Sequence, residues 1–299
     1  MKTVGIDIGG TKILGVVLNE HGQVLEQKEI PTSIEAGKES ILNSLVELTE
    51  QLMLDQTVQG IGIGSAGRID VDEGSVYYAT PNLPDWTGVN LKKRIEETFQ
   101  LPVTVDNDVN VASISEKWIG AAQDLESFVL ITIGTGIAAS VWVKGELLHG
   151  QHWSSGEIGH MILYPNGILC NCGQKGCLEQ YVSGSALHKL YNSQSMKQVQ
   201  NGREFFEQLD EGDLQAQAVL DQFVEDFSVA LINLSHTFDP EAFIIGGGLI
   251  KTKDYWWHRL IEQFEQNSSS SFKTINLRET RLGTMSSAVG AAKMVMSNI

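Results

Sequence analysis

Residues 4–18 read VGIDIGGTKILGVVL, and residues 128–143 repeat the same pattern as FVLITIGTGIAASVWV. In both, an apolar run of strand length leads into a turn of glycine and threonine, and a second apolar run follows. Short apolar runs bounded by turn residues are typical of buried strands. A repeated pattern of this kind indicates two related lobes, each offering its turn to one phosphate chain. We therefore expect a nucleotide in the cleft between two lobes.

The first turn carries the residue types that a phosphate site needs. Gly9 and Gly10 let the backbone approach a ligand and take positive φ angles, while Thr11 and Lys12 offer a hydroxyl and a cation. Asp7, at the end of the preceding strand, is costly to bury unless a cation or hydrogen-bond donors accompany it. A plain hairpin with a Gly-Gly turn also explains this turn when it is taken alone.

Composition limits the classes of protein to which the chain can belong. Its 299 residues, 42% of them hydrophobic and 19% charged, predict a soluble globular protein with one large or two medium domains. The net charge of −16 disfavours nucleic-acid partners, although backbone N–H groups and a divalent cation can still hold a phosphate locally. No apolar stretch is long enough to span a membrane, and no signal peptide is evident. Three cysteines, an odd number, favour a reducing compartment, so we expect the cytoplasm.

Periodicity predicts alternating strands and helices, and therefore an α/β class. Apolar residues at helical spacing predict helices at residues 36–54, 89–99, 109–120, 214–236 and 288–296. Further strands are predicted at residues 23–30, 60–64, 103–105 and 243–245, the last of which opens onto a triple-glycine turn.

Two loops at predicted strand ends carry candidate ligand-binding groups, since ligands of open α/β sheets lie at such ends. The first loop contains Gly67. The second is Asp106-Asn107-Asp108, where a strand gives way to a helix. Asn and Asp are good helix caps, but one cap needs only one of them, and a carboxylate here can also act as a general base. In the loop of residues 79–88, Trp86 is either a platform for a sugar or, as we favour, a half-buried anchor.

All three cysteines fall within eight positions, and a histidine precedes them by ten residues. Three sulfurs and one nitrogen match a closed, tetrahedral zinc site, in which no position is left open for catalysis. Buried or free thiols are the alternative. The predicted ligands are His160, Cys170, Cys172 and Cys177.

Taken together, these motifs resemble the ROK family of sugar kinases and related repressors, along nearly the whole chain. The matching segments are a first phosphate motif at residues 7–12, a catalytic segment at 106–108, a sugar-binding signature at 157–160, a zinc motif at 170–179 and an adenosine motif at 245–248.

The resemblance implies a two-lobed hexokinase/actin-like (ribonuclease H-like) α/β ATPase fold with an interlobe cleft. The expected lobes are a small one of residues 1–117 with 288–299 and a large one of residues 118–287, which carries the zinc motif. Assembly as a homodimer or homotetramer is also expected.

The resemblance also assigns roles to single residues. Asp108 is the expected general base. The expected sugar ligands are Gly67, Asn82, Asn107, Glu157, His160 and Glu179. Those expected for ATP are Asp7, Gly9, Gly10, Thr11, Lys12, Thr135, Gly136, Gly247 and Gly248, with Mg²⁺ held near Asp7 through water. The zinc is expected to be structural and to support Glu157 and Glu179.

The implied activity is ATP-dependent phosphorylation of a hexose hydroxyl, foremost the 6-OH of glucose. N-acetylmannosamine, N-acetylglucosamine, fructose and β-glucosides are alternative substrates. Residues 138–140, Ala-Ala-Ser, stand where the family has further glycines, and residues 283–288 also depart from its pattern, which keeps a non-catalytic sugar-binding regulator as another alternative. A repressor needs a DNA-binding domain before the first strand, and we expect none because that strand begins at Val4.

Overall fold

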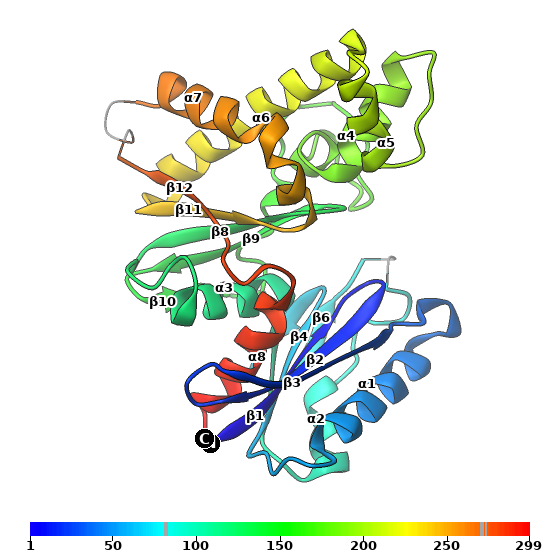
Figure 1. Cartoon of the computed structure of the whole chain (residues 1–299), viewed down its shortest axis with the longest axis vertical. Coiled ribbons are helices and arrows are strands. Elements are labelled where there is room, and N and C mark those ends of the chain that lie inside the picture. Colours follow the sequence, from blue (N-terminus) through cyan, green and yellow to red (C-terminus); the bar gives the residue numbers. More distant parts are fainter. Residues whose placement is uncertain (81–82, 270–271, 273) are drawn as a thin grey trace. The chain divides into compact units, whose positions relative to one another are not determined.

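The computed structural model describes residues 1–80, 83–269, 272 and 274–299. These residues form two compact units, and each unit contains one of the two repeated strand–turn–strand segments (Figure 1). The first unit comprises Met1–Asp124, Leu147–Ser155 and Thr280–Ile299, and the second comprises Leu125–Glu146 and Gly156–Glu279.

The first unit is built on a five-stranded sheet. Its order is β3 (Val24–Pro31), β2 (Lys12–Asn19), β1 (Lys2–Ile8), β4 (Ile61–Ser65) and β7 (Val103–Asn107). β1 pairs antiparallel with β2, and β2 antiparallel with β3, whereas β1–β4 and β4–β7 are parallel. The parallel strands are buried over nearly their whole length, which explains their continuous apolar sequence. The strands predicted from residues 4–8, 13–18, 23–30, 60–64 and 103–105 are thereby confirmed.

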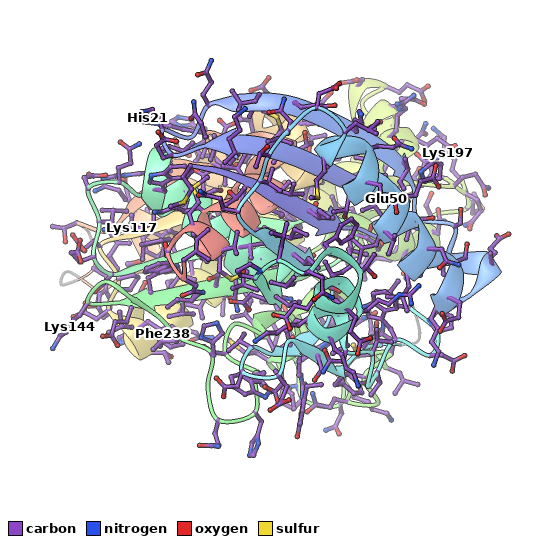
Figure 2. All side chains as sticks on the ribbon, turned by 90° about the horizontal axis from the view of Figure 1, so that it is seen from below. His21, Glu50, Lys117, Lys144, Lys197 and Phe238 are labelled. Atoms are coloured by element: carbon purple, nitrogen blue, oxygen red, sulfur yellow. The ribbon has the colours of Figure 1, made fainter. Side chains whose placement is uncertain are left out.

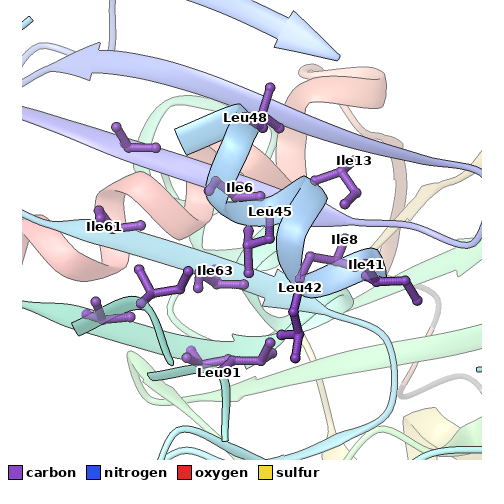
Figure 3. Packing of buried hydrophobic residues seen from close by; sticks show 14 of the residues in the cluster. Ile6, Ile8, Ile13, Ile41, Leu42, Leu45, Leu48, Ile61, Ile63 and Leu91 are labelled. Atoms are coloured by element: carbon purple, nitrogen blue, oxygen red, sulfur yellow. The ribbon is translucent and has the colours of Figure 1, made fainter. Parts of the chain in front are cut away.

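One face of this sheet is covered by α1 (Lys38–Met53), whose apolar stripe is buried. Alternate residues of β1 point to this face, because successive side chains of a strand point to opposite sides. α2 (Leu91–Phe99) adds Leu91 to the same core. Figure 3 shows the layer, with Ile6, Ile8, Ile13, Ile61 and Ile63 on the strands and Ile41, Leu42, Leu45 and Leu48 on α1.

The opposite face is covered by α8 (Ser286–Met296), which also packs on α3 (Asp108–Ile119). Glycines permit an unusually close approach, because a Cβ at Gly5 would lie 1.9 Å from the carbonyl oxygen of Ala288. A Cβ at Gly290 would likewise lie 1.6 Å from the carbonyl oxygen of Val111. Thr3 Oγ1 donates a hydrogen bond to the oxygen of Ala292 at 3.1 Å. The N-terminal strand is thus held by residues near the other end of the chain.

The second unit repeats the sheet topology of the first. Its order is β10 (Glu146–Leu147), β9 (Ile137–Val143), β8 (Phe128–Ile133), β11 (Ala242–Gly246) and β12 (Asn276–Glu279). β8 pairs antiparallel with β9 and parallel with β11, which in turn is parallel to β12. The strand–turn–strand repeat seen in the sequence therefore reflects a duplicated sheet.

Helices make up much of the rest of the second unit. They are α4 (Gly184–Gln194), α5 (Gly202–Asp210), α6 (Leu214–Phe238) and α7 (Trp257–Asn267). Phe264 of α7 packs edge-on against Phe243 of β11, with ring centroids 6.1 Å apart, so α7 lies on the sheet. Short 3₁₀ turns occur at η1 (Ile34–Ala36), η2 (Ile158–His160), η3 (Leu178–Gln180), η4 (Gly248–Tyr255) and η6 (Gly283–Met285).

Trp86 lies in the loop that follows the hairpin of β5 (Arg68–Asp70) and β6 (Ser75–Tyr78). Its side chain is fully buried, and its Nε1 donates to Ser65 Oγ at 3.1 Å. The anchor role is therefore confirmed. A sugar platform is wrong, because a ring with no exposed face cannot meet a ligand.

Charged side chains such as those of Glu50, Lys144 and Lys197 stand at the surface, as Figure 2 shows. Within the part of the chain that the structure describes, no helix has the length and apolarity needed to cross a bilayer.

Candidate functional site

The segment Asp106-Asn107-Asp108 joins β7 to α3, and its three side chains do three different things. Asn107 is the helix cap, since its Oδ1 accepts from the N–H groups of Val109 at 2.8 Å and Asn110 at 3.3 Å. Its Nδ2 donates to the carbonyl oxygen of Gly67 at 2.9 Å. One residue thus caps the helix and ties it to the loop that contains Gly67.

Asp106 is a buried carboxylate that sequence reasoning treated only as part of the acidic segment. Its Oδ1 accepts from the Asn107 N–H at 2.6 Å and from Asn110 Nδ2 at 2.9 Å. Its Oδ2 lies 2.7 Å from Nε2 of His149, a histidine that the sequence analysis did not select. A single histidine in a loop carries no periodicity or motif by which it could have been found.

Asp108 is the first residue of α3, at the end of a helix where the backbone N–H groups favour negative charge. Its Oδ1 accepts from the Val109 N–H at 3.0 Å, and its main-chain oxygen accepts from Ser287 Oγ of α8 at 3.0 Å. Both the carboxylate and the backbone of Asp108 are therefore held within the first unit.

Asp7 lies close enough to Asp108 for the two carboxylates to interact. Burial and, to a lesser extent, the charge of Asp108 raise the pKa of Asp7 while Lys12 lowers it, and together they bring this pKa to about 7. A buried carboxylate beside a second one is a position where a cation would be favourable. This observation fits the expected Mg²⁺ near Asp7.

The first glycine turn is open. The Gly9 N–H donates to the oxygen of Lys12 at 3.1 Å, and its own oxygen accepts from Thr32 Oγ1 at 2.6 Å. A Cβ at Gly10 would meet nothing within 4 Å. Neither glycine adopts the positive φ that glycine permits, and the turn closes through the Gly9–Lys12 bond without it. Lys12 Nζ lies 2.7 Å from Glu29 Oε2.

The second glycine turn is filled. Its Gly134 N–H donates to the oxygen of Gly136 at 2.9 Å. A Cβ at Gly136 would lie 2.1 Å from Oε2 of Glu179, and that same oxygen accepts from the Ile137 N–H at 3.3 Å. The predicted sugar ligand Glu179 thus lies directly against the predicted phosphate turn.

The predicted adenosine turn adjoins this second glycine turn. Gly247 has a φ of 90°, and a Cβ there would lie 2.4 Å from the carbonyl oxygen of Ile133, the residue that leads into the second turn. The Gly184 N–H at the start of α4 donates to the oxygen of Gly134 at 2.8 Å. Backbone N–H groups and glycine turns therefore gather at one edge of the second sheet.

The four predicted metal ligands converge. Their ligand atoms all lie within 4.8 Å of one another, with Cys172 Sγ 3.6 Å from Cys177 Sγ and Cys170 Sγ 3.8 Å from His160 Nδ1. Tetrahedral zinc bonds of the usual length separate neighbouring ligand atoms by about 3.5–3.8 Å. The residues therefore fit a closed zinc site in number, chemistry and spacing.

His160 joins this cluster to one predicted sugar ligand. While its Nδ1 faces Cys170, its Nε2 lies 3.8 Å from Oε2 of Glu157. Glu179 comes two residues after Cys177, in η3. Both glutamates are thus attached to the short segments that the cysteine–histidine cluster holds.

Each unit gathers its own share of the predicted site residues. The first unit contains Asp7, Gly9, Gly10, Thr11, Lys12, Gly67, Asn107 and Asp108, and the second contains Thr135, Gly136, Glu157, His160, Glu179, Gly247 and Gly248. Asn82, predicted to bind sugar, lies outside the described residues.

A sequence model of the ROK family matches residues 3–298, nearly the whole chain. The chain belongs to the ROK family. The glucokinase of Thermotoga maritima is 31% identical to this ROK protein over an alignment of 313 residues, which covers 100% of this chain and 98% of the relative.

Solved structures of ROK proteins match over the whole chain as well. A ROK hexokinase from Thermus thermophilus has a TM-score of 0.87 at 32% identity and covers 100% of both chains. A ROK glucokinase from Streptomyces griseus, solved in complex with glucose and AMPPNP, has a TM-score of 0.84 at 30% identity and covers 98% of this chain and 99% of the other. The predicted hexokinase/actin-like α/β fold is thus confirmed.

Proposed function

We propose that this ROK protein is an ATP-dependent hexose kinase, with glucose as its foremost substrate and Asp108 as its general base. The observation that carries the proposal is the placement of Asp108 at the start of α3, beside the buried Asp7 and fixed by Asn107 and Ser287. Its likeness to a glucokinase over the whole chain supports the same activity.

The chemistry follows from the weakness of a sugar hydroxyl as a nucleophile at neutral pH. Asp108 accepts the hydroxyl proton while the sugar oxygen forms a bond to the γ-phosphorus of ATP. The bond from that phosphorus to the bridging oxygen breaks, and ADP leaves. Phosphoryl transfer depends mainly on positioning and charge stabilisation, which the glycine turns and helix N-termini supply.

Sugar recognition in this proposal uses carboxylates and amides, because a hexose offers many hydroxyls and no charge. The proposed sugar ligands are Gly67, Asn82, Asn107, Glu157, His160 and Glu179. Each unpaired hydroxyl or carboxylate in a closed site would cost about 1–3 kcal/mol, which makes such a set selective.

The nucleotide would be held by both glycine turns and the adenosine turn. Thr11, Lys12, Thr135 and Gly136 are the proposed phosphate ligands, and Gly247 with Gly248 would approach the adenosine. When bound, Mg²⁺ neutralises phosphate charge, and Asp7 would hold it through water. Lys12 must leave Glu29 to reach a phosphate, which an exposed ion pair permits at little cost.

Zinc in this proposal is structural, with His160, Cys170, Cys172 and Cys177 as its four ligands. Because His160 also lies beside Glu157, the metal would orient a sugar ligand without contacting the sugar. The lobes of residues 1–117 with 288–299 and 118–287 stay a prediction, as does the homodimer or homotetramer. Sedimentation analysis of the purified protein measures the latter directly.

A coupled ATP-consumption assay across a sugar panel tests the function. We expect the highest kcat/KM with glucose, and ³¹P NMR of the product should show phosphate on the 6-OH. N-acetylmannosamine, N-acetylglucosamine, fructose and a β-glucoside complete the panel. Absence of turnover with every sugar, in protein that contains zinc and is supplied with Mg²⁺, would refute the proposal.

A further inference from the structure

His149 lies on a short segment that leaves the second unit and returns to it. Leu147–Ser155 belongs to the first unit, whereas the residues on both sides of it belong to the second. The contact that His149 makes there is with Asp106, at 2.7 Å between Nε2 and Oδ2. The Asp106 side chain is only 3% exposed and that of His149 is 27% exposed.

Asp106 connects this contact to the predicted catalytic segment. Its other oxygen accepts from the Asn107 N–H and from the Asn110 side chain, so the carboxylate fixes both the turn and the first turn of α3. Asn107 in turn caps α3 and holds Gly67. A change in the position of Asp106 would therefore reach Asp108 through one residue of backbone.

We propose that His149 is a positioning residue for the phosphoryl transfer, acting through Asp106 on the turn that presents Asp108. The inference rests on the proposed function for its kinetic consequences, although the His149–Asp106 pair is itself a feature of the fold. The contact of His149 that carries this proposal is the one with Asp106. The imidazolium of His149 balances the charge of the buried Asp106 carboxylate, which lies two positions before the general base. Without this balance, the buried charge would change the conformation of the turn.

The charge of His149 is part of this role. Burial lowers its pKa, but the hydrogen bond and charge of Asp106, with a further contribution from the charge of Asp72, raise it overall. The edge of the Trp153 ring completes its surroundings, with ring centroids 6.4 Å apart. Because the folded-state pKa is raised, the imidazolium is present at low pH and is lost as pH rises through that pKa. A neutral imidazole still donates to Asp106 but no longer balances its charge.

Three variants distinguish the effect of the His149 charge from that of its hydrogen bond and from that of replacing an exposed histidine. His149→Gln can keep a donor near Oδ2 of Asp106 without a titratable charge, whereas His149→Ala removes both. His152→Gln is the matched control, because His152 is exposed on the same segment.

We expect His149→Ala to lower kcat about tenfold to a hundredfold while the KM for ATP stays within about twofold, as misplacement of a reacting group does. His149→Gln should retain kcat within about fivefold, and the alkaline limb of the pH–kcat profile should lose the step that His149 contributes. His152→Gln should match the unmodified protein throughout.

An NMR titration of the His149 imidazole, in the unmodified protein and in Asp106→Asn, tests the pairing without any activity. The pKa of His149 should fall in Asp106→Asn, and an unchanged pKa would show that the two side chains do not interact.

A His149→Ala enzyme with unaltered kcat and pH profile overturns the positioning role. A His149→Gln enzyme that loses as much kcat and Tm as His149→Ala, and keeps the original pH profile, also overturns the positioning role. If the unmodified protein phosphorylates no hexose, the proposed function fails, but the titration still shows whether His149 and Asp106 interact.

Discussion

The two sheets share one strand order, and in both the central strand pairs antiparallel with the strand that follows it and parallel with the next, but the sheets differ at their turns. In the first sheet Gly10 of the glycine turn faces open space, and an acid, Asp7, stands one residue before the strand end. In the second, the turn at Gly136 is filled by Glu179, and Thr132 occupies the position that corresponds to Asp7. The same framework thus carries an open turn beside a buried acid in one copy and a turn packed against Glu179 in the other.

The strands that follow the repeats differ in the same way. β7 leads through Asn107 into Asp108 and α3, whereas β12 ends at Glu279, which is paired with Lys253. Function in a duplicated fold therefore resides in the residues at the strand ends, which can diverge while the buried strands stay alike. Four experiments test whether the first sheet supplies the carboxylates that act in catalysis. They also test whether the second supplies a ligand-binding edge that the cysteine–histidine cluster supports.

Asp108→Asn should have the largest effect, because it removes the proposed base and leaves the shape of the first sheet unchanged. We expect kcat to fall about a thousandfold, within the range that general bases contribute. Glucose binding, measured by calorimetry, should stay within about threefold. A variant that turns over at near the original rate would place the base elsewhere and remove the catalytic distinction between the two sheets.

Asp7→Asn tests the buried acid that Thr132 replaces in the second sheet. The folded-state pKa of about 7 lies above the ordinary value of 3.8, so the contribution of Asp7 to the free energy of unfolding is fully present below pH 4 and is lost as pH rises through 7. The loss amounts to at most about 4 kcal/mol.

Without added magnesium, urea unfolding should show Asp7→Asn to be the more stable protein at pH 8, with the difference shrinking towards pH 4. Equal stability of the two proteins at every pH would show that burial of Asp7 carries no such penalty.

Cys172→Ala tests whether the metal cluster supports the binding edge of the second unit. Metal analysis should show about one zinc per chain in the unmodified protein and little in the variant. The KM for glucose should rise about tenfold because His160, Glu157 and Glu179 lose their orientation.

Lys175→Ala is the control for this experiment, since Lys175 is exposed on the same loop. An unchanged KM in a zinc-free Cys172→Ala protein would separate the cluster from sugar binding.

The smallest effect is expected from adding one methyl group to each glycine turn, by the substitutions Gly10→Ala and Gly136→Ala. Gly136→Ala would place a Cβ 2.1 Å from Glu179 Oε2, so this side chain must turn away and give up the Ile137 N–H, and the free energy of unfolding should fall by about 1 kcal/mol. Gly10→Ala meets nothing within 4 Å, and its unfolding free energy should stay within about 0.5 kcal/mol. Equal losses in the two variants would contradict the distinction between an open and a filled turn.

The strands and main helices could be predicted because buried apolar runs and helical stripes leave a clear pattern in the sequence. The cysteine cluster could be predicted for a similar reason, since its ligands are close in the chain. The His149–Asp106 contact could not, because it joins residues 43 positions apart and depends on a loop that crosses between units.

The glycine turns show a different limit of sequence reasoning. Glycine permits a positive φ but does not require it, and Gly9 and Gly10 use their lack of a side chain without that conformation. Similarly, the contact of Glu179 with the second turn follows from packing and not from any local pattern.

The placement of α8 against β1 has a consequence for synthesis of the protein. Thr3 and Ala292, which are hydrogen-bonded, are separated by 289 positions, so a ribosome completes nearly the whole chain before the N-terminal strand acquires this partner. Until then, Leu14, Val16 and Leu18 lack the helix that buries them in the finished fold. The nascent first unit therefore has one apolar sheet face uncovered until α8 has been synthesised.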